Sequence, residues 1–416
     1  YYGGHSHCNL SCFSGKSVVL RSLQLLFLSL GILLGGSGAL FAKDIDISGI
    51  RFGQNGNVTR FVLDVSEKAE PSIFLLADPY RVVIDLPEAD WRASDSVKAS
   101  GAVDGFRHGL FSPGIYRIVL DLKDPAVIKS SFHLPPRGGY GHRLVLDLET
   151  TSRDRFLVAV KDSKKARPVI VAKATPEVVS PRRSVTGKRV IVIDPGHGGP
   201  DPGNLGVIGV HEKVIVLAIA RAVRDELVST GRYDVRMTRD RDIFWPVRER
   251  FRIARRHGAD LFISIHADSI NRPDVKGGSV YNLSETASDK EAARLAAREN
   301  KSDVIAGVNL EQADDEVSSI LIDLAQRETM NFSAQFAAIL VSELERDVPM
   351  LRRAHRFANL GMLKAPDVPS VLLEAGYLTN KQNARFLNSR DGQRRIAKAV
   401  RRAIDRYFEQ MVALGR

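Results

Sequence analysis

The sequence predicts an α/β domain with a mostly parallel sheet covered by helices on both faces, preceded by an all-β sandwich domain with internal duplication. Three observations support this fold. Continuous aliphatic runs, typical of buried parallel strands, alternate with helical patterns in the C-terminal half. One short β-rich hexamer occurs four times in the N-terminal half. A basic stretch with several prolines separates the two halves, so we expect two domains.

Residues 1–42 have the pattern of a secretory signal peptide. Lys16 and Arg21 precede the apolar run 23–34, and small residues follow that run. The run is short for a bilayer span, which favours cleavage after Ala39 or Ala42 over the alternative, an uncleaved signal anchor. We therefore expect an exported protein without a stable membrane span after signal removal.

Cysteine content and net charge limit the chemistry that we expect. Both cysteines, Cys8 and Cys12, precede the apolar run, so the exported chain would have neither disulfides nor cysteine-ligated metal. The formal net charge of +11 favours an anionic partner. Because export disfavours nucleic acid, we expect no nucleic-acid partner, and a cell-wall polymer or a membrane surface remains.

Residues 43–150 predict the all-β domain. The repeated hexamers are β-rich, begin with Arg and carry Asp at their fifth position: 60–65, 81–86, 117–122 and 143–148. Turn-forming residues flank each of them, which indicates two small sheets packed face to face. The Arg and Asp side chains are expected to form a solvated ladder across strands. A carbohydrate-binding surface is the alternative.

Residues 151–187 predict a basic linker, since prolines and charge of one sign oppose compaction. From residue 188 to residue 416, strands and helices alternate. Strands are expected at 190–194, 232–238, 261–268, 277–283 and around Leu372. Helices are expected from about Glu212, after Pro246, over about 287–347 and at the C-terminal end, which together imply the helix-covered parallel sheet.

Polar residues follow three of the aliphatic runs. His197 lies between glycines just after the first run, His266 lies near the end of the 261–268 run, and Glu374 follows Leu373. Open α/β sheets place ligand sites where parallel strands end, so these side chains are expected to converge. Without cysteine, a metal would have to be held by His and carboxylates, and Zn²⁺ is the ion that this set favours.

A catalytic zinc site needs a third protein ligand, with one position left for water. Glu212, at the start of the helix after the His197 loop, is the best placed candidate, and its neighbour His211 competes with it. Residue chemistry alone does not choose between them. A glutamate in a first helical turn is also common simply because it interacts with the helix dipole.

Glu374 has the position and chemistry of a proton shuttle. Zinc lowers the pKa of water from about 15.7 towards about 7, but amide cleavage also needs a proton delivered to the leaving nitrogen. A carboxylate beside the metal can act as base and then as acid. A buried Glu374 paired with an arginine is the alternative.

The segments 194–199, 211–213, 264–268 and 374–380 resemble, in this order, the motifs of the zinc-dependent N-acetylmuramoyl-L-alanine amidases of bacterial cell division. The resemblance covers the chain from about Lys188 onward. It implies that His197, Glu212 and His266 are the zinc ligands and that Glu374 is the catalytic glutamate. The duplicated β-domain resembles the AMIN module, which targets such enzymes to peptidoglycan in Gram-negative periplasms.

The resemblance implies a periplasmic amidase, concentrated at the division septum. It would hydrolyse the bond between N-acetylmuramic acid and L-alanine in peptidoglycan during daughter-cell separation. A zinc carboxypeptidase or endopeptidase acting within the stem peptide is one alternative. A non-catalytic wall-binding protein with a structural metal site is another, although a structural site has no use for Glu374.

Relatives of this type carry an inserted helix that blocks the active site until a LytM-type activator displaces it. The resemblance implies such an insertion at about 284–315, with its helix over 288–300. This helix is alanine-rich, and Leu295 is its only large apolar residue, so it should detach easily. Glu299 is expected to occupy the open zinc position, with Glu291 as second candidate. An ordinary surface helix is the alternative.

Overall fold

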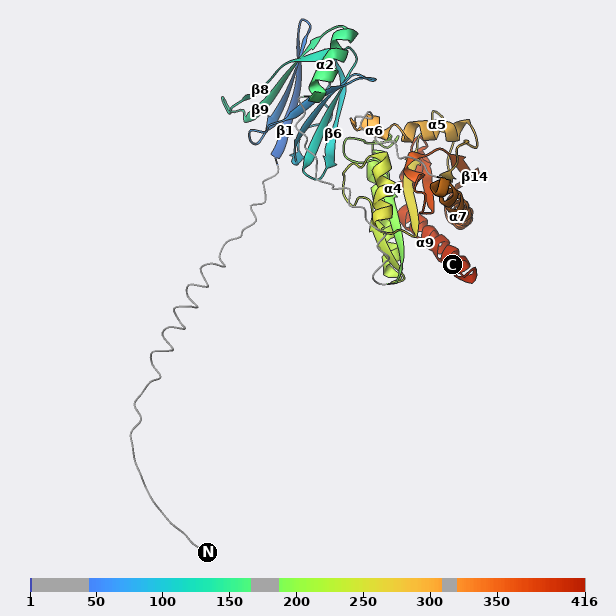
Figure 1. Ribbon diagram of the computed structural model, residues 1–416. Helices are drawn as coiled ribbons and strands as arrows, with labels where there is room; N and C mark the ends of the chain where they lie inside the picture. The colour runs from blue at the N-terminus through green and yellow to red at the C-terminus, as the bar shows by residue number, and fades with distance from the viewer. Residues whose placement is uncertain (2–44, 166–186, 309–319, 416) are drawn as a thin grey trace. The chain divides into compact units, whose positions relative to one another are not determined.

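The structure of the protein is a computed structural model, which describes Tyr1 and residues 45–165, 187–308 and 320–415 (Figure 1). The expected signal peptide and the end of the expected insertion, residues 309–315, lie outside the described residues. The chain from Asp44 onward makes up one compact unit. Among the described residues, no helix is both long and apolar enough to cross a membrane.

The N-terminal part is all-β, as the hexamers predict. One antiparallel sheet has the strand order β3-β4-β7-β6, and the other has the order β5-β1-β2-β9-β8, in which only the β1–β5 pair is parallel. Aliphatic residues from both sheets share one buried core. The strands are β1 (Ile45–Asn55), β2 (Val58–Val65), β3 (Ser72–Leu76), β4 (Arg81–Pro87), β5 (Ala89–Trp91), β6 (Val103–Ser112), β7 (Ile115–Leu122), β8 (Ala126–Leu134) and β9 (His142–Thr150).

The four hexamers form the central strands of these sheets. The first and the fourth, in β2 and β9, are neighbours in the five-stranded sheet, and the second and third, in β4 and β7, are neighbours in the four-stranded sheet. Each sheet therefore combines hexamers from both halves of the duplication. The Arg and Asp residues consequently lie opposite each other across strands, with Arg60 opposite Asp147 and Asp85 opposite Arg117.

The segment expected to be a linker begins with a helix instead, α2 (Arg153–Lys165). Phe156 and Val160, one helical turn apart, are buried in the core of the β-domain. Phe156 also contacts Tyr80 edge-to-face, with ring centroids 5.0 Å apart. Burial of these two apolar side chains outweighs the many charges of the segment, which had suggested an unstructured chain.

The C-terminal part is α/β, with a six-stranded sheet of order β11-β10-β12-β15-β13-β14. Strands β11, β10, β12 and β15 are parallel, and β13 runs antiparallel to β15 and parallel to β14. The strands are β10 (Arg189–Pro195), β11 (Tyr233–Met237), β12 (Leu261–Asp268), β13 (Gly278–Leu283), β14 (Met350–Ala358) and β15 (Ser370–Tyr377). The sheet is thus mostly parallel, as expected.

Helices cover both faces of this sheet, because its central strands alternate apolar side chains between two cores. In β10, Ile191 and Ile193 face one core, whereas Val190 and Val192 face the other. The first core contains α3 (Glu212–Ser229), α7 (Ile320–Leu344), α8 (Lys381–Leu387) and α9 (Arg390–Ala413). The second contains α4 (Val247–Arg256), α5 (Lys290–Glu299) and η2 (Gly361–Leu363). Figure 1 shows α4 and α9 on either side of the strands.

The region 287–347, expected to be helical, is divided. It contains α5, the short α6 (Ser302–Ile305) and α7 in its described residues. Asp289 caps α5 by accepting a hydrogen bond from the amide of Ala292 at 2.9 Å. Strand β14 follows α7 and was not expected, because its basic residues hide the strand pattern; as an edge strand it can carry them.

Candidate metal and catalytic centre

His197 lies in the loop that follows β10. The amide of Gly196 donates to the carbonyl of Ile265 at 2.9 Å, which ties this loop to β12. A Cβ atom on Gly196 would come within 2.3 Å of the His266 ring, so glycine is required for the two segments to approach. His197 itself adopts a positive φ of 57°, unusual for a non-glycine residue. The local backbone therefore holds the His197 ring at the end of the sheet.

His266 meets His197 from the neighbouring strand β12. The two rings are edge-to-face with centroids 4.9 Å apart, and both residues are buried. His197 Nε2 and His266 Nδ1 face the same carboxylate oxygen, Glu212 Oε1, at 3.1 and 3.4 Å. Sequence analysis predicted that these three side chains converge, and the fold brings them together.

Glu212 is the first residue of α3 and is fully buried. Its Oε1 accepts from the amide of Ala267 at 2.9 Å, and its Oε2 accepts from the amide and side chain of Asn204 at 3.1 and 2.7 Å. A Cβ atom on Gly203 would come within 2.8 Å of Glu212 and of His197, which again requires glycine. His211, the competing candidate, is exposed at the N-cap of α3.

Glu299, at the end of α5, enters the same centre. Its Oε2 lies 3.2 Å from His266 Nδ1 and 3.6 Å from His197 Nε2, and the residue is 1% exposed. His197, His266 and Glu299 can each offer a ligand atom, all within 4.8 Å of one another. Glu291, the second candidate, has a side chain 45% exposed and pairs with Arg294 on the surface.

Asp201 supports His197 from the other side of the ring. Its Oδ2 lies 2.9 Å from His197 Nδ1, which leaves Nε2 directed at the carboxylates. Asp201 is fully buried and also accepts a hydrogen bond from Ser302 in α6. Burial alone would raise the pKa of Asp201, but His197 and Ser302 lower it, so this side chain is an anion.

Asp201 was not predicted from the sequence. The only signal was an acidic residue four positions after His197 in the same glycine-rich loop. Carboxylates commonly orient histidine ligands through the second ring nitrogen, so a search of that loop for an acid could have found it.

Two further residues that sequence reasoning missed fix the His197 loop. Arg250 of α4, 2% exposed, donates to Asp194 at 2.9 Å and to the carbonyl of His197 at 2.9 Å. Ser264 of β12 donates to the other oxygen of Asp194 at 2.7 Å. Because Asp194 precedes the loop and Arg250 spans it, this network holds His197 in its unusual conformation.

Glu374 lies on β15 directly beside His266, its register partner on β12. It is 2% exposed, and neither carboxylate oxygen has a hydrogen-bond partner among the described residues. Burial and the nearby carboxylates of Asp268, Glu212 and Glu299 raise the pKa of Glu374 well above its ordinary value. A buried carboxyl group without other partners can take part in proton transfer.

Arg298 balances part of this negative charge. It pairs with Asp268 at 2.8 Å and with Oε1 of its neighbour Glu299 at 3.0 Å. Burial opposes the charge of Arg298, but these carboxylates outweigh burial and raise its pKa. The end of α5 therefore brings both a carboxylate and a cation to the centre.

The titration behaviour of the centre follows from its charges. Burial would lower the pKa of His197, but Glu212 and Asp201 outweigh burial and raise it well above the ordinary value. Burial would raise the pKa of Glu299, yet His266 and His197 lower it to about 2. The two histidines and the carboxylates therefore attract each other strongly in the absence of any ion.

The donor atoms fit a zinc ion. His197 Nε2, His266 Nδ1 and Glu299 Oε2 are buried but have no hydrogen-bond partner among the described residues. The close approaches of Glu212 and Glu299 to the histidines thus lack hydrogen-bond geometry, which is expected when several ligands face one shared position. Nitrogen and oxygen donors of this kind, without cysteine, suit Zn²⁺.

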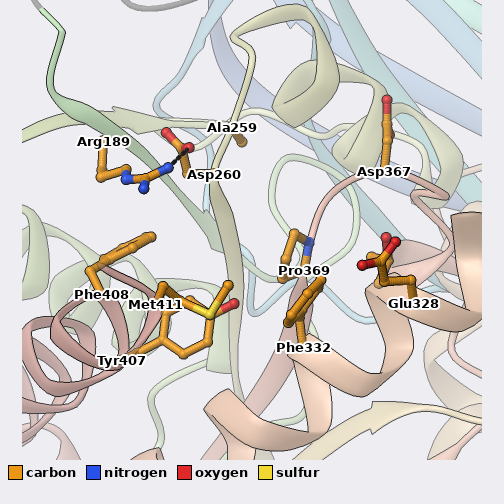
Figure 2. A pocket seen from close by; sticks show the side chains of 11 residues that line it. Arg189, Ala259, Asp260, Glu328, Phe332, Asp367, Pro369, Tyr407, Phe408 and Met411 are labelled. Atoms are coloured by element: carbon orange, nitrogen blue, oxygen red, sulfur yellow. Dashed lines mark hydrogen bonds and ion pairs between the residues drawn. The ribbon is translucent and has the colours of Figure 1, made fainter. Parts of the chain in front are cut away.

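A cavity of about 400 Å³ lies elsewhere, near the starts of the strands rather than their ends (Figure 2). Arg189 is the first residue of β10, and Asp260 directly precedes β12. The two form an ion pair at 3.0 Å in the wall of this cavity. Phe332 of α7 and Tyr407 and Phe408 of α9 supply aromatic walls. None of the metal-centre residues lines it, so it is separate from the centre at the strand ends.

Comparison with known proteins assigns both parts of the chain. Residues 191–406 match a family model described as N-acetylmuramoyl-L-alanine amidase, and residues 49–148 match the model of the AMIN domain.

Curated relatives match along most of the chain. An N-acetylmuramoyl-L-alanine amidase AmiC of Neisseria meningitidis is 32% identical over 371 residues, which are 85% of this chain and 88% of that protein. AmiC of Escherichia coli is 30% identical over 407 residues, 92% of this chain and 97% of the relative. Among solved structures, the amidase AmiC2 of Nostoc punctiforme is 28% identical, with a TM-score of 0.39, over 54% of this chain and 98% of its own.

Proposed function

We propose a zinc-dependent and self-inhibited mechanism for this chain, which belongs to the N-acetylmuramoyl-L-alanine amidase family and carries an N-terminal AMIN domain. As a member of that family, the protein is an N-acetylmuramoyl-L-alanine amidase. Its substrate is the amide bond that joins the lactyl group of N-acetylmuramic acid to L-alanine in peptidoglycan.

His197, Glu212 and His266 are the proposed zinc ligands. The observation that carries this proposal is the approach of His197 Nε2 and His266 Nδ1 to Glu212 Oε1, at 3.1 and 3.4 Å, in a buried site without hydrogen-bond geometry between them. A zinc ion held by these residues would lower the pKa of water from about 15.7 towards about 7 and would polarise the amide carbonyl.

Glu374 is the proposed proton shuttle. It accepts the proton of the attacking water while the new C–O bond forms at the carbonyl carbon. It then delivers that proton to the nitrogen of L-alanine, which leaves as an amine when the C–N bond breaks. The position of Glu374 beside His266 and its lack of other hydrogen-bond partners support both steps, because the carboxyl group is free to exchange the proton.

Glu299 is the proposed inhibitor of the enzyme. Its carboxylate lies 3.2 Å from His266 Nδ1 and 3.6 Å from His197 Nε2, so it would compete with water for a zinc ion held by these residues. Apolar burial contributes little to holding α5, since Leu295 is its one large buried apolar side chain beside Ala292 and Ala296. A partner that displaces the helix must therefore mainly replace the polar contacts of Glu299 and Arg298.

The proposed setting is the periplasm at the division septum. The expected signal peptide and the match to the AMIN domain support export and wall binding. A LytM-type activator is the proposed partner that displaces α5, and peptidoglycan is the polymer that the basic chain approaches. Splitting of septal peptidoglycan would then occur only where the activator is present.

The inhibitory role is tested with purified, zinc-loaded protein and dye-labelled sacculi. Either Glu299→Ala or deletion of residues 288–300 should raise the activity measured without activator, because the position opposite the histidines is freed. Glu291→Ala, on the exposed side of the same helix, is the matched control and should leave basal activity unchanged. Equal or lower turnover in folded Glu299→Ala and deletion variants would disprove the inhibitory role.

A further inference from the structure

The two copies of the Arg/Asp ladder have different surroundings. In the five-stranded sheet, Arg60 pairs with Asp147 at 2.7 Å and its side chain is 55% exposed. In the four-stranded sheet, Arg117 pairs with Asp85 at 2.6 Å, yet its side chain is 1% exposed. The first ladder is solvated, as the sequence predicted. The second is covered.

Residues 304–307, which follow α5 and Glu299, cover this second ladder. Arg117 donates from Nη1 to the carbonyls of Ala306 at 3.2 Å and Gly307 at 2.9 Å. Arg107 donates from Nε to the carbonyl of Ile305 at 2.7 Å, and Arg81 donates to the carbonyl of Val304. Three arginines of one sheet therefore bind the carbonyls of residues 304–307, at the C-terminal end of α6.

The end of α6 offers acceptors to the arginines. Carbonyls in the last turn of a helix lack N–H donors from a following turn and can accept from side chains, although Val304 O also accepts from the amide of Gly307 at 3.1 Å. The aspartates of the ladder orient two of the arginines: Asp85 binds Nε and Nη2 of Arg117, and Asp121 binds both Nη atoms of Arg107. Nη1 of Arg117 and Nε of Arg107 are thereby left to donate to the carbonyls of the segment.

The sheet also offers an apolar floor to the same segment. Val83 and Val119, both fully buried, lie beneath Gly307. Gly307 has a positive φ of 73°, and a Cβ atom there would lie 3.1 Å from Val83 and 3.3 Å from Val119. Glycine at position 307 therefore lets the backbone lie directly on the sheet.

The other end of the segment is held at the metal centre. Ser302 donates to Asp201, the carboxylate that orients His197, and Glu299 lies beside both histidines. Only a short stretch of chain separates these contacts from the arginines. If Glu299 and Ser302 move away from the metal centre, the arginine contacts a few residues later are therefore strained or broken as well.

We propose that the face of the β3-β4-β7-β6 sheet bearing Arg81, Arg107 and Arg117 is an intramolecular docking surface for residues 304–307, and that docking there helps to hold the enzyme inhibited. This inference rests on the proposed inhibitory role of Glu299. The AMIN domain then has a second role besides wall binding, since one of its two ladders closes the active site. An activator must overcome this docking as well as the contacts of α5.

The test compares full-length, zinc-loaded variants by hydrogen exchange of residues 290–308 and by basal activity on labelled sacculi. Gly307→Val places a side chain against Val83 and Val119, and a double variant, Arg81→Gln with Arg107→Gln, removes two donors from the sheet. Both should increase exchange in 290–308 about tenfold, equal to ~1.4 kcal/mol lost from the docked state. Basal activity should rise together with the hydrogen exchange of these residues.

Arg60→Gln, at the matching position of the solvated ladder, is the control and should change neither readout. If both docking variants keep the parent's melting temperature and the parent's exchange rates, the docking surface is disproved. If exchange rises but basal activity does not, docking is real but its inhibitory role is overturned. The inhibitory role of Glu299 is tested separately: Glu299→Ala that fails to activate would disprove it, while the exchange data would still decide on docking.

Discussion

Individual residues of the centre are held by partners on both sides. Glu212 has both carboxylate oxygens occupied by amide donors while its Oε1 also faces the two histidines. His197 has its Nδ1 bound by Asp201 and its backbone carbonyl bound by Arg250. Ligands that are fixed in advance need little rearrangement to bind an ion, which favours tight metal binding.

Asp201→Asn should weaken zinc binding by about 10- to 100-fold, because the His197 ring loses the carboxylate that orients it. Competition with a fluorescent zinc chelator measures this affinity independently of activity. Asp225→Asn is the matched control, since that side chain is 66% exposed and pairs with its neighbour Arg224 on the surface. An unchanged zinc affinity in a folded Asp201→Asn protein would refute the orienting role.

Glu374→Gln should lower turnover by about 10²- to 10⁴-fold, the scale of a lost general acid and base. Its zinc content should stay at the level of the parent, because Glu374 is not a proposed ligand. Metal analysis and turnover on sacculi are measured on the same preparation, with exposed Glu409→Gln as control. Loss of zinc together with activity would instead make Glu374 part of the metal site.

The sequence predicted the functional residues that follow strands. It missed the residues whose hydrogen bonds join segments far apart in the chain. His197, His266 and Glu374 could be placed because parallel strands end at one edge of the sheet. Asn204 and Arg250 could not, since their hydrogen bonds join segments whose relative position depends on the complete fold. Glu212 was preferred over His211 only through the family resemblance.

Among the elements, α7 and α9 are joined by a charged contact as well as by their shared core. Glu343 of α7 accepts hydrogen bonds from Arg402 of α9 at 2.9 Å and from Arg346 at 2.7 Å. Burial would raise the pKa of Glu343, but these arginines outweigh burial and lower it from the ordinary value of 4.5. The folded protein therefore binds fewer protons at this residue than the unfolded chain does.

This lowered pKa fixes the sign of a pH effect. Glu343 stabilises the fold above about pH 4.5, its ordinary pKa, and that contribution is lost as the pH falls further. Glu343→Gln should thus cost about 1 kcal/mol of unfolding free energy at pH 7 and progressively less in acid. Urea unfolding at pH 7 and below pH 4 measures this, with exposed Glu345→Gln as control. A constant difference between parent and Glu343→Gln would contradict the assignment.

Sequence patterns predicted helices and strands correctly where apolar residues recur at a regular spacing. The strands around 190–194 and 261–268 and the helices that start at Glu212 and after Pro246 agree with the structure. Helix α2 and strand β14 differ from expectation because their charges dominate their composition, while a few apolar contacts decide their structure. Phe156 in α2 shows how one buried ring can do so.

At the scale of the whole molecule, the duplicated β-domain and the α/β domain were both predicted, and the fold confirms them. The hexamers indicated the duplication, but not that each sheet combines strands from both halves. Nor could they indicate that one Arg/Asp ladder is solvated and the other is covered. That difference depends on residues 304–307, which lie far from the hexamers in sequence.

We propose that the protein is a zinc amidase of peptidoglycan that Glu299 keeps closed. Mass spectrometry of the products released from purified sacculi, by the parent and by Glu299→Ala, tests it most directly. We predict free stem peptides and intact glycan strands, faster release by Glu299→Ala, and no release by either protein after zinc is removed with a chelator. Muropeptides released with peptide still attached to sugar, or peptides cut within the stem, would contradict the claim.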